Sequence, residues 1–155
     1  RGLGDVYKRQ VINAHAMPGA HAALQAVKDA GLRCALFTNP SFPQGAIECR
    51  MGWGDLADAP FELVTHMGNA TRCKPDATYY LEQLQVMGLE PHEVLMVGND
   101  PKRDFPSPDC GIQTAFVGQG KPSRATWRGT MEDFARDFNA VVEAFYEHQV
   151  ADELS

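Results

Sequence analysis

Apolar and polar positions along this chain follow two patterns, one of short continuous apolar runs and one with the period of a helix. Short apolar runs bounded by Gly, Pro or polar residues are typical of buried strands, whereas apolar residues three or four apart indicate amphipathic helices. The pattern predicts strands over residues 32–37, 61–65, 94–97 and 112–117, and helices over 18–31, 43–51 and 75–87 and from 130 onward.

Local stop and start signals support these boundaries. Pro75 fits the first turn of a helix, where its missing N–H has no partner to lose, and Gly31 and Gly88 fit helix ends. Thr130 and Asp133 have the spacing of a capping box. Residues 118–129 are expected to form a loop.

Strands that alternate with helices of this length are joined by right-handed crossovers and form a parallel sheet covered on both faces. The pattern therefore predicts an α/β fold. The carboxyl ends of parallel strands meet at one edge of the sheet, where ligands of such folds bind. Polar groups that directly follow strands are thus the first candidates for a functional site.

Three polar signals occupy such positions. Thr38-Asn39 follows one apolar run, Asn99-Asp100 follows another with Asp104 four residues on, and Lys74 precedes the helix that Pro75 begins. A transferring phosphoryl group spreads negative charge over its oxygens, so a hydroxyl and an ammonium group suit it. Carboxylate and amide oxygens are ligands that Mg²⁺ accepts.

In their order along the chain these motifs resemble those of the haloacid dehalogenase-like (HAD) hydrolases. That family carries an Asp-x-Asp motif at its first strand, a Ser or Thr at the end of the second, a Lys, and an acidic pair after a strand that ends in Gly. Thr38 matches the second motif, Lys74 the third and residues 98–104 the fourth, while residues 17–31 resemble the helix before the second motif. The resemblance covers roughly residues 17–118, and the joint order is more specific than any single motif.

The resemblance implies a three-layer, Rossmann-like parallel sheet and a magnesium-dependent phosphatase. Such an enzyme hydrolyses a small phosphorylated metabolite through an aspartyl-phosphate intermediate. Thr38 and Lys74 would be catalytic, and Thr38, Asn39 and Lys74 would bind the substrate. Asn99, Asp100 and Asp104 would hold Mg²⁺.

Two departures from the family pattern change what is expected. Asn99 stands where the family has its metal-binding Asp, so either Asn99 or the following Asp100 is the direct ligand. No apolar run ending in Asp-x-Asp precedes Thr38, although that motif supplies the nucleophile and the general acid of the family. The resemblance places the missing first strand at the centre of the sheet, between the strands that end at Thr38 and Gly98. We therefore expect these 155 residues to be unstable alone and inactive, although the parent protein is an enzyme.

The beginning of the chain suggests a reason for the missing motif. Residues 5–10 resemble an in-frame translation of the transposase mosaic-end sequence used in sequencing-library preparation. We interpret residues 1–10 as a non-native, adapter-derived leader, with a natural polar leader as the alternative. Residues 11–150 are then a partial HAD-like core domain.

Composition excludes several classes of partner. A net charge of −6 argues against nucleic acid and anionic membranes, and no apolar stretch is long enough for a membrane span. The four cysteines lack CxxC spacing, which favours reduced thiols and a cytoplasmic location. The oligomeric state and the substrate are not predicted.

Simpler roles and other functions compete with this hypothesis. Thr38 also suits a helix cap or turn, Lys74 a solvated surface charge, and Asp100 and Asp104 the turn around Pro101. A receiver domain uses similar residues, but it places its acidic residues before the Thr and its Lys last. A phosphate-binding protein without turnover remains the alternative function.

Overall fold

The structure is a computed structural model that describes residues 16–120, 122 and 124–155. The interpreted leader, residues 1–10, lies outside the described residues. The elements are α2 (Ala20–Asp29), β1 (Ala35–Leu36), α3 (Gln44–Trp53), β2 (Leu63–Val64), α4 (Ala77–Met87), β3 (Leu95–Gly98), β4 (Gln113–Val117), β5 (Trp127–Gly129), α5 (Met131–Arg136) and α6 (Phe138–Glu153), with short 3₁₀ turns at Pro91–Glu93 and Pro108–Cys110.

Helix ends follow the signals in the sequence. The side chain of Asp76 accepts a hydrogen bond from the backbone N–H of Thr78 and so caps α4, and Gly88 ends that helix with a positive φ of 68°. The capping box of Thr130 and Asp133 is confirmed at the start of α5, where each side chain accepts a bond from the other residue's backbone N–H.

All strand pairs are parallel, which confirms the predicted α/β class. β1 pairs with β2, with Leu36 opposite Val64. β4 lies between β3 and β5 in a second sheet. Within the described residues no strand joins β1 to β3, so the two sheets are not hydrogen-bonded to each other.

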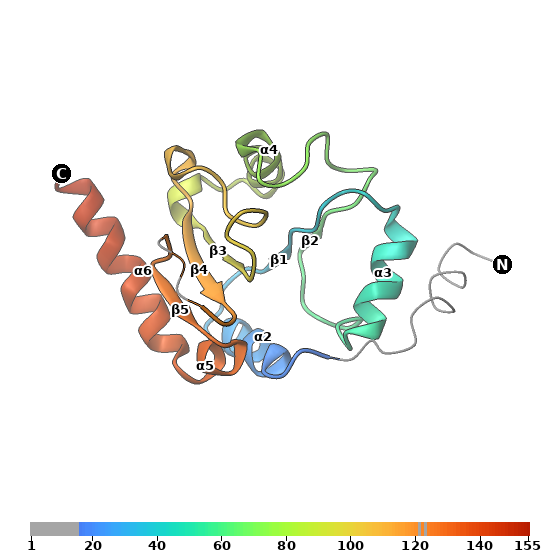
Figure 1. Ribbon diagram of the computed structural model, residues 1–155, viewed down its shortest axis with the longest axis horizontal. Coiled ribbons are helices and arrows are strands. Elements are labelled where there is room, and N and C mark those ends of the chain that lie inside the picture. Colours follow the sequence, from blue (N-terminus) through green and yellow to red (C-terminus); the bar gives the residue numbers. More distant parts are fainter. Residues whose placement is uncertain (1–15, 121, 123) are drawn as a thin grey trace.

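Helices cover both faces of the β3–β4–β5 sheet, as a three-layer arrangement requires. On one face, Ala115 and Val117 of β4 pack with Ala23 of α2, Phe134 of α5 and Val141 of α6. On the other face, Tyr79, Tyr80 and Leu84 of α4 pack with Met96 of β3. Val94 and Ile112, which directly precede β3 and β4, belong to the same cluster. Figure 1 shows α6 running along this sheet and α3 beyond the β1–β2 pair.

The structure corrects two predictions near the carboxyl end. The expected single helix from residue 130 is divided into α5 and α6 at Asp137, whose φ of −100° and ψ of 21° are not helical. The Arg136 side chain holds the Asp137 carboxylate at this corner, and the Phe134 and Phe138 rings stay in contact across it. The expected loop over 118–129 contains a strand, β5, because its backbone pairs with β4.

Candidate functional site

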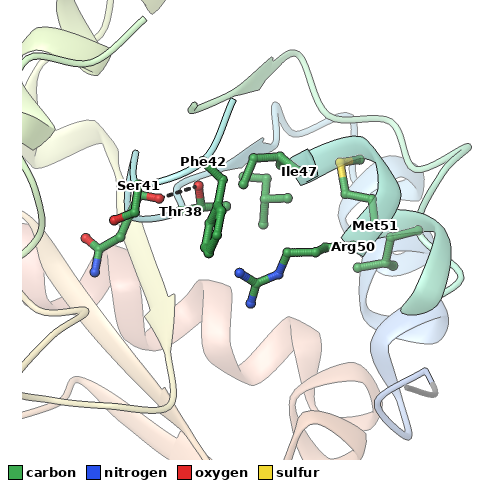
Figure 2. A pocket seen from close by; sticks show the side chains of 9 residues that line it. Thr38, Ser41, Phe42, Ile47, Arg50 and Met51 are labelled. Atoms are coloured by element: carbon green, nitrogen blue, oxygen red, sulfur yellow. Dashed lines mark hydrogen bonds between the residues drawn. The ribbon is translucent and has the colours of Figure 1, made fainter. Parts of the chain in front are cut away.

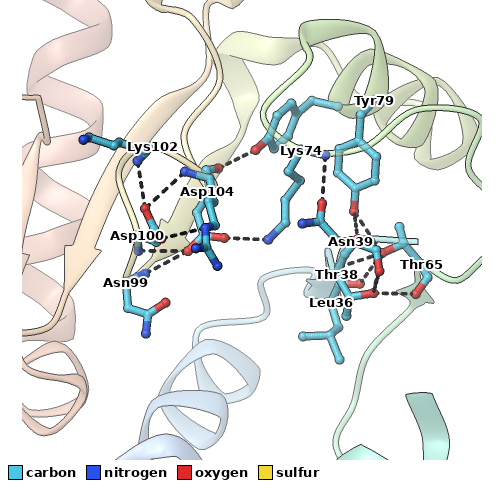
Figure 3. Close-up of polar contacts among 12 residues, drawn as sticks. Leu36, Thr38, Asn39, Thr65, Lys74, Tyr79, Asn99, Asp100, Lys102 and Asp104 are labelled. Atoms are coloured by element: carbon cyan, nitrogen blue, oxygen red, sulfur yellow. Dashed lines mark hydrogen bonds and ion pairs between the residues drawn. The ribbon is translucent and has the colours of Figure 1, made fainter. Parts of the chain in front are cut away.

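The lysine and the second acidic residue of the site form an ion pair. Lys74 Nζ lies 2.6 Å from Asp104 Oδ1, and the two side chains are only 10% and 14% exposed. Lys74 lies in the segment before α4 and Asp104 in the turn after β3, 30 residues apart in sequence. Figure 3 shows the Lys74 side chain spanning the space between these two segments. An ion pair that is mostly shielded from solvent interacts more strongly than a surface ion pair, because less water screens the two charges.

Main-chain groups at the end of β3 fix the other oxygen of Asp104. Its Oδ2 accepts hydrogen bonds from the backbone N–H groups of Asn99 at 3.1 Å and Asp100 at 3.0 Å. A Cβ atom on Gly98 would lie 2.6 Å from the Cβ of Asp104, so only glycine allows this close approach. The strand-ending glycine of the motif therefore has a steric role.

A side-chain amide joins the first and second segments of the site. Asn39 Oδ1 accepts a hydrogen bond of 3.0 Å from the backbone N–H of Lys74, whose peptide bond to Pro75 is cis. This bond brings the end of β1 next to the lysine (Figure 3). Since Oδ1 is engaged, the Asn39 NH₂ group is the part of this amide that is available to a ligand.

The hydroxyl of Thr38 is engaged with the neighbouring strand. Thr38 Oγ1 donates to the backbone oxygen of Thr65 at 2.9 Å, and the Thr38 N–H donates to Thr65 Oγ1 at 2.7 Å. Tyr79 also donates from its hydroxyl to the Thr38 backbone oxygen at 2.6 Å. Thr38 thus sits just past the predicted strand and is held there by hydrogen bonds to Thr65 and Tyr79.

Asn99 and Asp100 are adjacent to the ion pair but are oriented differently from Asp104. Asp100 Oδ1 accepts from the backbone N–H groups of Lys102 and Arg103, and Asp100 Oδ2 lies 3.3 Å from Arg103 Nε. Figure 3 shows the Asn99 side chain pointing away from the Asp104 carboxylate. Of the three predicted metal ligands, the structure brings only Asp104 against Lys74.

A complete metal site is not formed by these residues. Over residues 16–120, 122 and 124–155, no group of three or more His, Cys, Asp or Glu residues gathers closely enough to hold a metal ion. Mg²⁺ takes about six oxygen ligands in octahedral geometry, usually including water and phosphate oxygens. The donors of this chain therefore fit only a part of a magnesium site.

A pocket of about 440 Å³ opens beside Thr38 and Asn39. Its lining mixes apolar side chains with the polar groups of Thr38, Asn39, Ser41 and Arg50, and the Arg50 guanidinium lies 5.2 Å from the centre of the Phe42 ring. Figure 2 shows that α3 provides Ile47, Arg50 and Met51 to this lining. A pocket with both apolar and polar groups can hold the organic part of a small polar ligand.

Two buried tyrosines of the site were not identified from the sequence. Tyr79 and Tyr80 are both fully buried, and Tyr80 donates from its hydroxyl to the backbone oxygen of Asp104. Burial is the main cause that raises the pKa of each phenol, so both remain protonated donors near neutral pH. Their position one turn after Lys74 is the only sequence signal that marked them, and it is equally typical of core residues.

Two further features concern the cysteine side chains and the length of the helices. All four cysteines are free. None of the helices in the described part of the chain is long and apolar enough to cross a membrane.

Comparison with known proteins finds one family and one curated relative. A sequence model of the haloacid dehalogenase-like hydrolases matches residues 3–108. A phosphoserine phosphatase from Thermus thermophilus is 31% identical over 121 residues, which are 77% of this chain and 47% of that protein. The chain therefore spans about half the length of this relative.

Solved structures share the fold. A HAD phosphatase from Thermococcus onnurineus superposes with a TM-score of 0.68 and 18% identity, over 89% of this chain and 65% of that one. A β-phosphoglucomutase from Clostridium difficile has a TM-score of 0.71 and 15% identity, over 95% of this chain and 63% of that one. At these identities the superpositions support the architecture alone.

Proposed function

Because the chain belongs to the haloacid dehalogenase-like hydrolase family, we propose that it is the phosphate-binding part of a magnesium-dependent phosphatase that acts on small phosphorylated substrates. The observation that carries this proposal is the Lys74–Asp104 pair at 2.6 Å, joined to the end of β1 by the bond from Lys74 N–H to Asn39. Three segments that are far apart in sequence thereby present their polar groups at one place.

Each residue has a distinct role in this proposal. The Lys74 ammonium group faces the phosphoryl oxygens and stabilises the charge that they carry in the transition state. The Thr38 hydroxyl and the Asn39 NH₂ group donate hydrogen bonds to the same oxygens. The Asp104 carboxylate holds Lys74 in place, which positions its charge before the substrate arrives.

The magnesium ion is a further part of the proposal. When bound, Mg²⁺ would neutralise charge on the phosphoryl group, as it does in phosphoryl transfer generally. Asp104 would supply one carboxylate to it, and Asn99 or Asp100 would supply a second oxygen. The remaining ligands would come from the segment with the nucleophile and from the substrate, because the described residues hold no group of three or more His, Cys, Asp or Glu that could bind a metal ion.

The nucleophile lies outside these residues in our proposal. The printed sequence contains no Asp-x-Asp, and the chain spans about half of its curated relative. We therefore propose that the aspartyl nucleophile and general acid belong to a longer parent protein, and that these 155 residues alone do not turn over substrate.

The substrate class follows from the pocket and from the relative. The pocket beside Thr38 has room for a small organic group, and the named relative is a phosphoserine phosphatase. We propose a small phosphorylated metabolite, with its organic part in this pocket. The four free thiols support a cytoplasmic location.

Hydrolysis of an aryl phosphate in the presence of Mg²⁺ tests this proposal. The 155-residue chain should release no phosphate above background, whereas the parent protein should do so. In the parent, Lys74→Ala should lower kcat by about 10²-fold or more, and Thr38→Val should lower it less because only one neutral hydrogen bond is lost. Turnover by the chain alone, or an unchanged rate in Lys74→Ala, would contradict the proposal.

One alternative is a protein of this family that binds phosphate without turnover. A parent protein whose whole sequence also lacks Asp-x-Asp would favour it. A parent protein that binds phosphate but hydrolyses no phosphate ester would support it.

A further inference from the structure

The pairing of β1 with β2 continues beyond the backbone ladder through a side chain. The last backbone bond of this pair runs from the Thr65 N–H to the Leu36 oxygen at 3.0 Å. The backbone N–H of Thr38, two residues past the end of β1, instead donates to Thr65 Oγ1 at 2.7 Å. The Thr65 hydroxyl in turn lies 3.0 Å from the Thr38 backbone oxygen, so it accepts from one main-chain group of Thr38 and donates to the other.

A second buried side chain, that of Tyr79, also binds the backbone oxygen of Thr38. Tyr79 OH donates to Thr38 O at 2.6 Å and lies 2.9 Å from Thr65 Oγ1. Thr65 and Tyr79 are both 0% exposed. Figure 3 shows the two side chains converging on Thr38 from β2 and from α4. A buried hydroxyl without a partner is costly, and here both hydroxyls are used to fix one residue.

We propose that Thr65 and Tyr79 are positioning residues, which fix the main chain of Thr38 so that its hydroxyl meets a phosphoryl oxygen. The Thr38 hydroxyl now donates to Thr65 O at 2.9 Å. Rotation about the Cβ–Oγ1 bond redirects that proton to an anion without moving Oγ1, provided that the backbone stays fixed. The inference rests on the proposed phosphate site and adds the residues that build it.

Binding of inorganic phosphate to the parent protein tests this inference without catalysis, because we expect the 155 residues to be unstable alone. Phosphate is titrated against the ¹⁵N-labelled parent protein, and Kd is obtained from the amide signals of Thr38 and Asn39. Thr65→Val keeps the shape of the side chain and removes its hydroxyl, so Kd should rise by about 5–10-fold, as expected for losing one or two hydrogen bonds. Thr65→Ser keeps the hydroxyl and should stay within about twofold of the unmodified chain.

Two further variants separate positioning from general stability. Tyr79→Phe keeps the ring and loses one donor, so it should weaken binding in the same direction, and it serves if Thr65→Val does not fold. Thr114→Val is the matched control, because Thr114 is a 5% exposed threonine of β4 whose hydroxyl bonds the Arg124 backbone oxygen outside the site. Its Kd should not change.

The outcomes distinguish the inference from the proposed function. If the unmodified parent protein shows no saturable response to phosphate, the phosphate site is wrong and the positioning role falls with it. If the parent protein binds phosphate and both Thr65→Val and Tyr79→Phe bind it equally well, the site stands and the positioning role is wrong. Equal weakening by Thr114→Val would also overturn the positioning role.

Discussion

Close packing around the Asp104 carboxylate is the most specific residue-scale feature of the site. The carboxylate accepts two backbone N–H bonds and the Lys74 ammonium group, and it reaches them only because Gly98 has no Cβ. A single glycine thus links the end of a strand to the geometry of an ion pair.

Gly98→Ala should displace Asp104 and destabilise the chain by about 1–3 kcal/mol, the usual range for an overpacked buried position. The matched control is Gly45→Ala in α3, where an added Cβ meets nothing within 4 Å. That control should be neutral or stabilising by less than about 1 kcal/mol, since alanine favours a helix. Denaturant unfolding of both variants measures the difference, and equal stabilities would show that the close approach is unimportant.

Lys74→Met keeps the length of the side chain and leaves the Asp104 carboxylate without its cation. We expect a loss on the order of 2 kcal/mol, less than for a fully buried pair because both side chains keep some exposure. Lys102→Met, at an exposed lysine of the neighbouring turn, should change stability by less than about 0.5 kcal/mol. Equal urea midpoints for the two variants would mean that the ion pair contributes nothing to folding.

Some residues of the candidate site could be predicted from the sequence, and others could not. Thr38, Lys74 and Asp104 could be predicted because strand ends and motif order mark them, and their roles stay predictions. Thr65 and Tyr79 were missed because a buried Thr after a strand and an aromatic residue in a helix have no sequence signal that separates them from ordinary core residues. The orientation of Asn99 and Asp100 depends on backbone N–H groups of the same turn, which spacing alone does not predict.

At the scale of elements, helix starts were easier to predict than strand lengths. Capping signals act within one turn, so Thr130 marked the start of α5, and Pro75 marked the start of α4 to within two residues, although the N-cap is Asp76. β1 and β2 have two residues each, fewer than their apolar runs suggested, because strand length depends on which neighbour pairs with the backbone. For the same reason β5 was missed, since its pairing with β4 decides its conformation.

Thr130→Ala removes the side-chain acceptor at the start of α5 and should cost about 1 kcal/mol, a typical value for an N-cap. Thr78→Ala is the comparison, because Thr78 is an exposed threonine in the first turn of α4 that receives its cap from Asp76. Thermal or urea unfolding should show a loss only for Thr130→Ala. A loss of the same size in both variants would contradict the capping role.

The contribution of the capping box to stability depends on pH, because Asp133 is one of its two residues. The backbone hydrogen bond from Thr130, followed by the Thr130 hydroxyl and Arg136, lowers the pKa of its carboxyl group. A carboxyl group with a lowered folded pKa stabilises the fold above its unfolded pKa of about 3.9, and this contribution is lost as the pH falls through the folded value. The stability difference between the unmodified chain and Asp133→Asn should therefore shrink as the pH falls below about 4. A difference that stays constant from pH 6 to pH 2 would contradict this assignment.

At the scale of the whole molecule, the central feature is a sheet in two parts. Every residue of β4, which has a strand on each side, is buried, whereas Leu95, Met96 and Val97 of β3 and both residues of β1 are only partly buried. Parallel sheets of this class are normally continuous and buried on both faces. Thr38 follows β1 and Gly98 ends β3, so the proposed phosphate site lies across the division between the two sheets.

The parallel α/β architecture was predictable because the helix and strand periods alternate clearly along the chain. The division into two sheets depends on which distant segments pair with each other, and only the family resemblance suggested it. Our account therefore depends on a further strand, carrying Asp-x-Asp, between β1 and β3 in the parent protein.

The coding sequence upstream of residue 11 in the genome of origin tests this claim most directly. We predict that it continues in frame into a short apolar run that ends in Asp-x-Asp, followed by a helical segment. A start codon within a few residues of Val11, with no Asp-x-Asp before Thr38, would contradict the account, because the site would then have no nucleophile and the sheet no central strand.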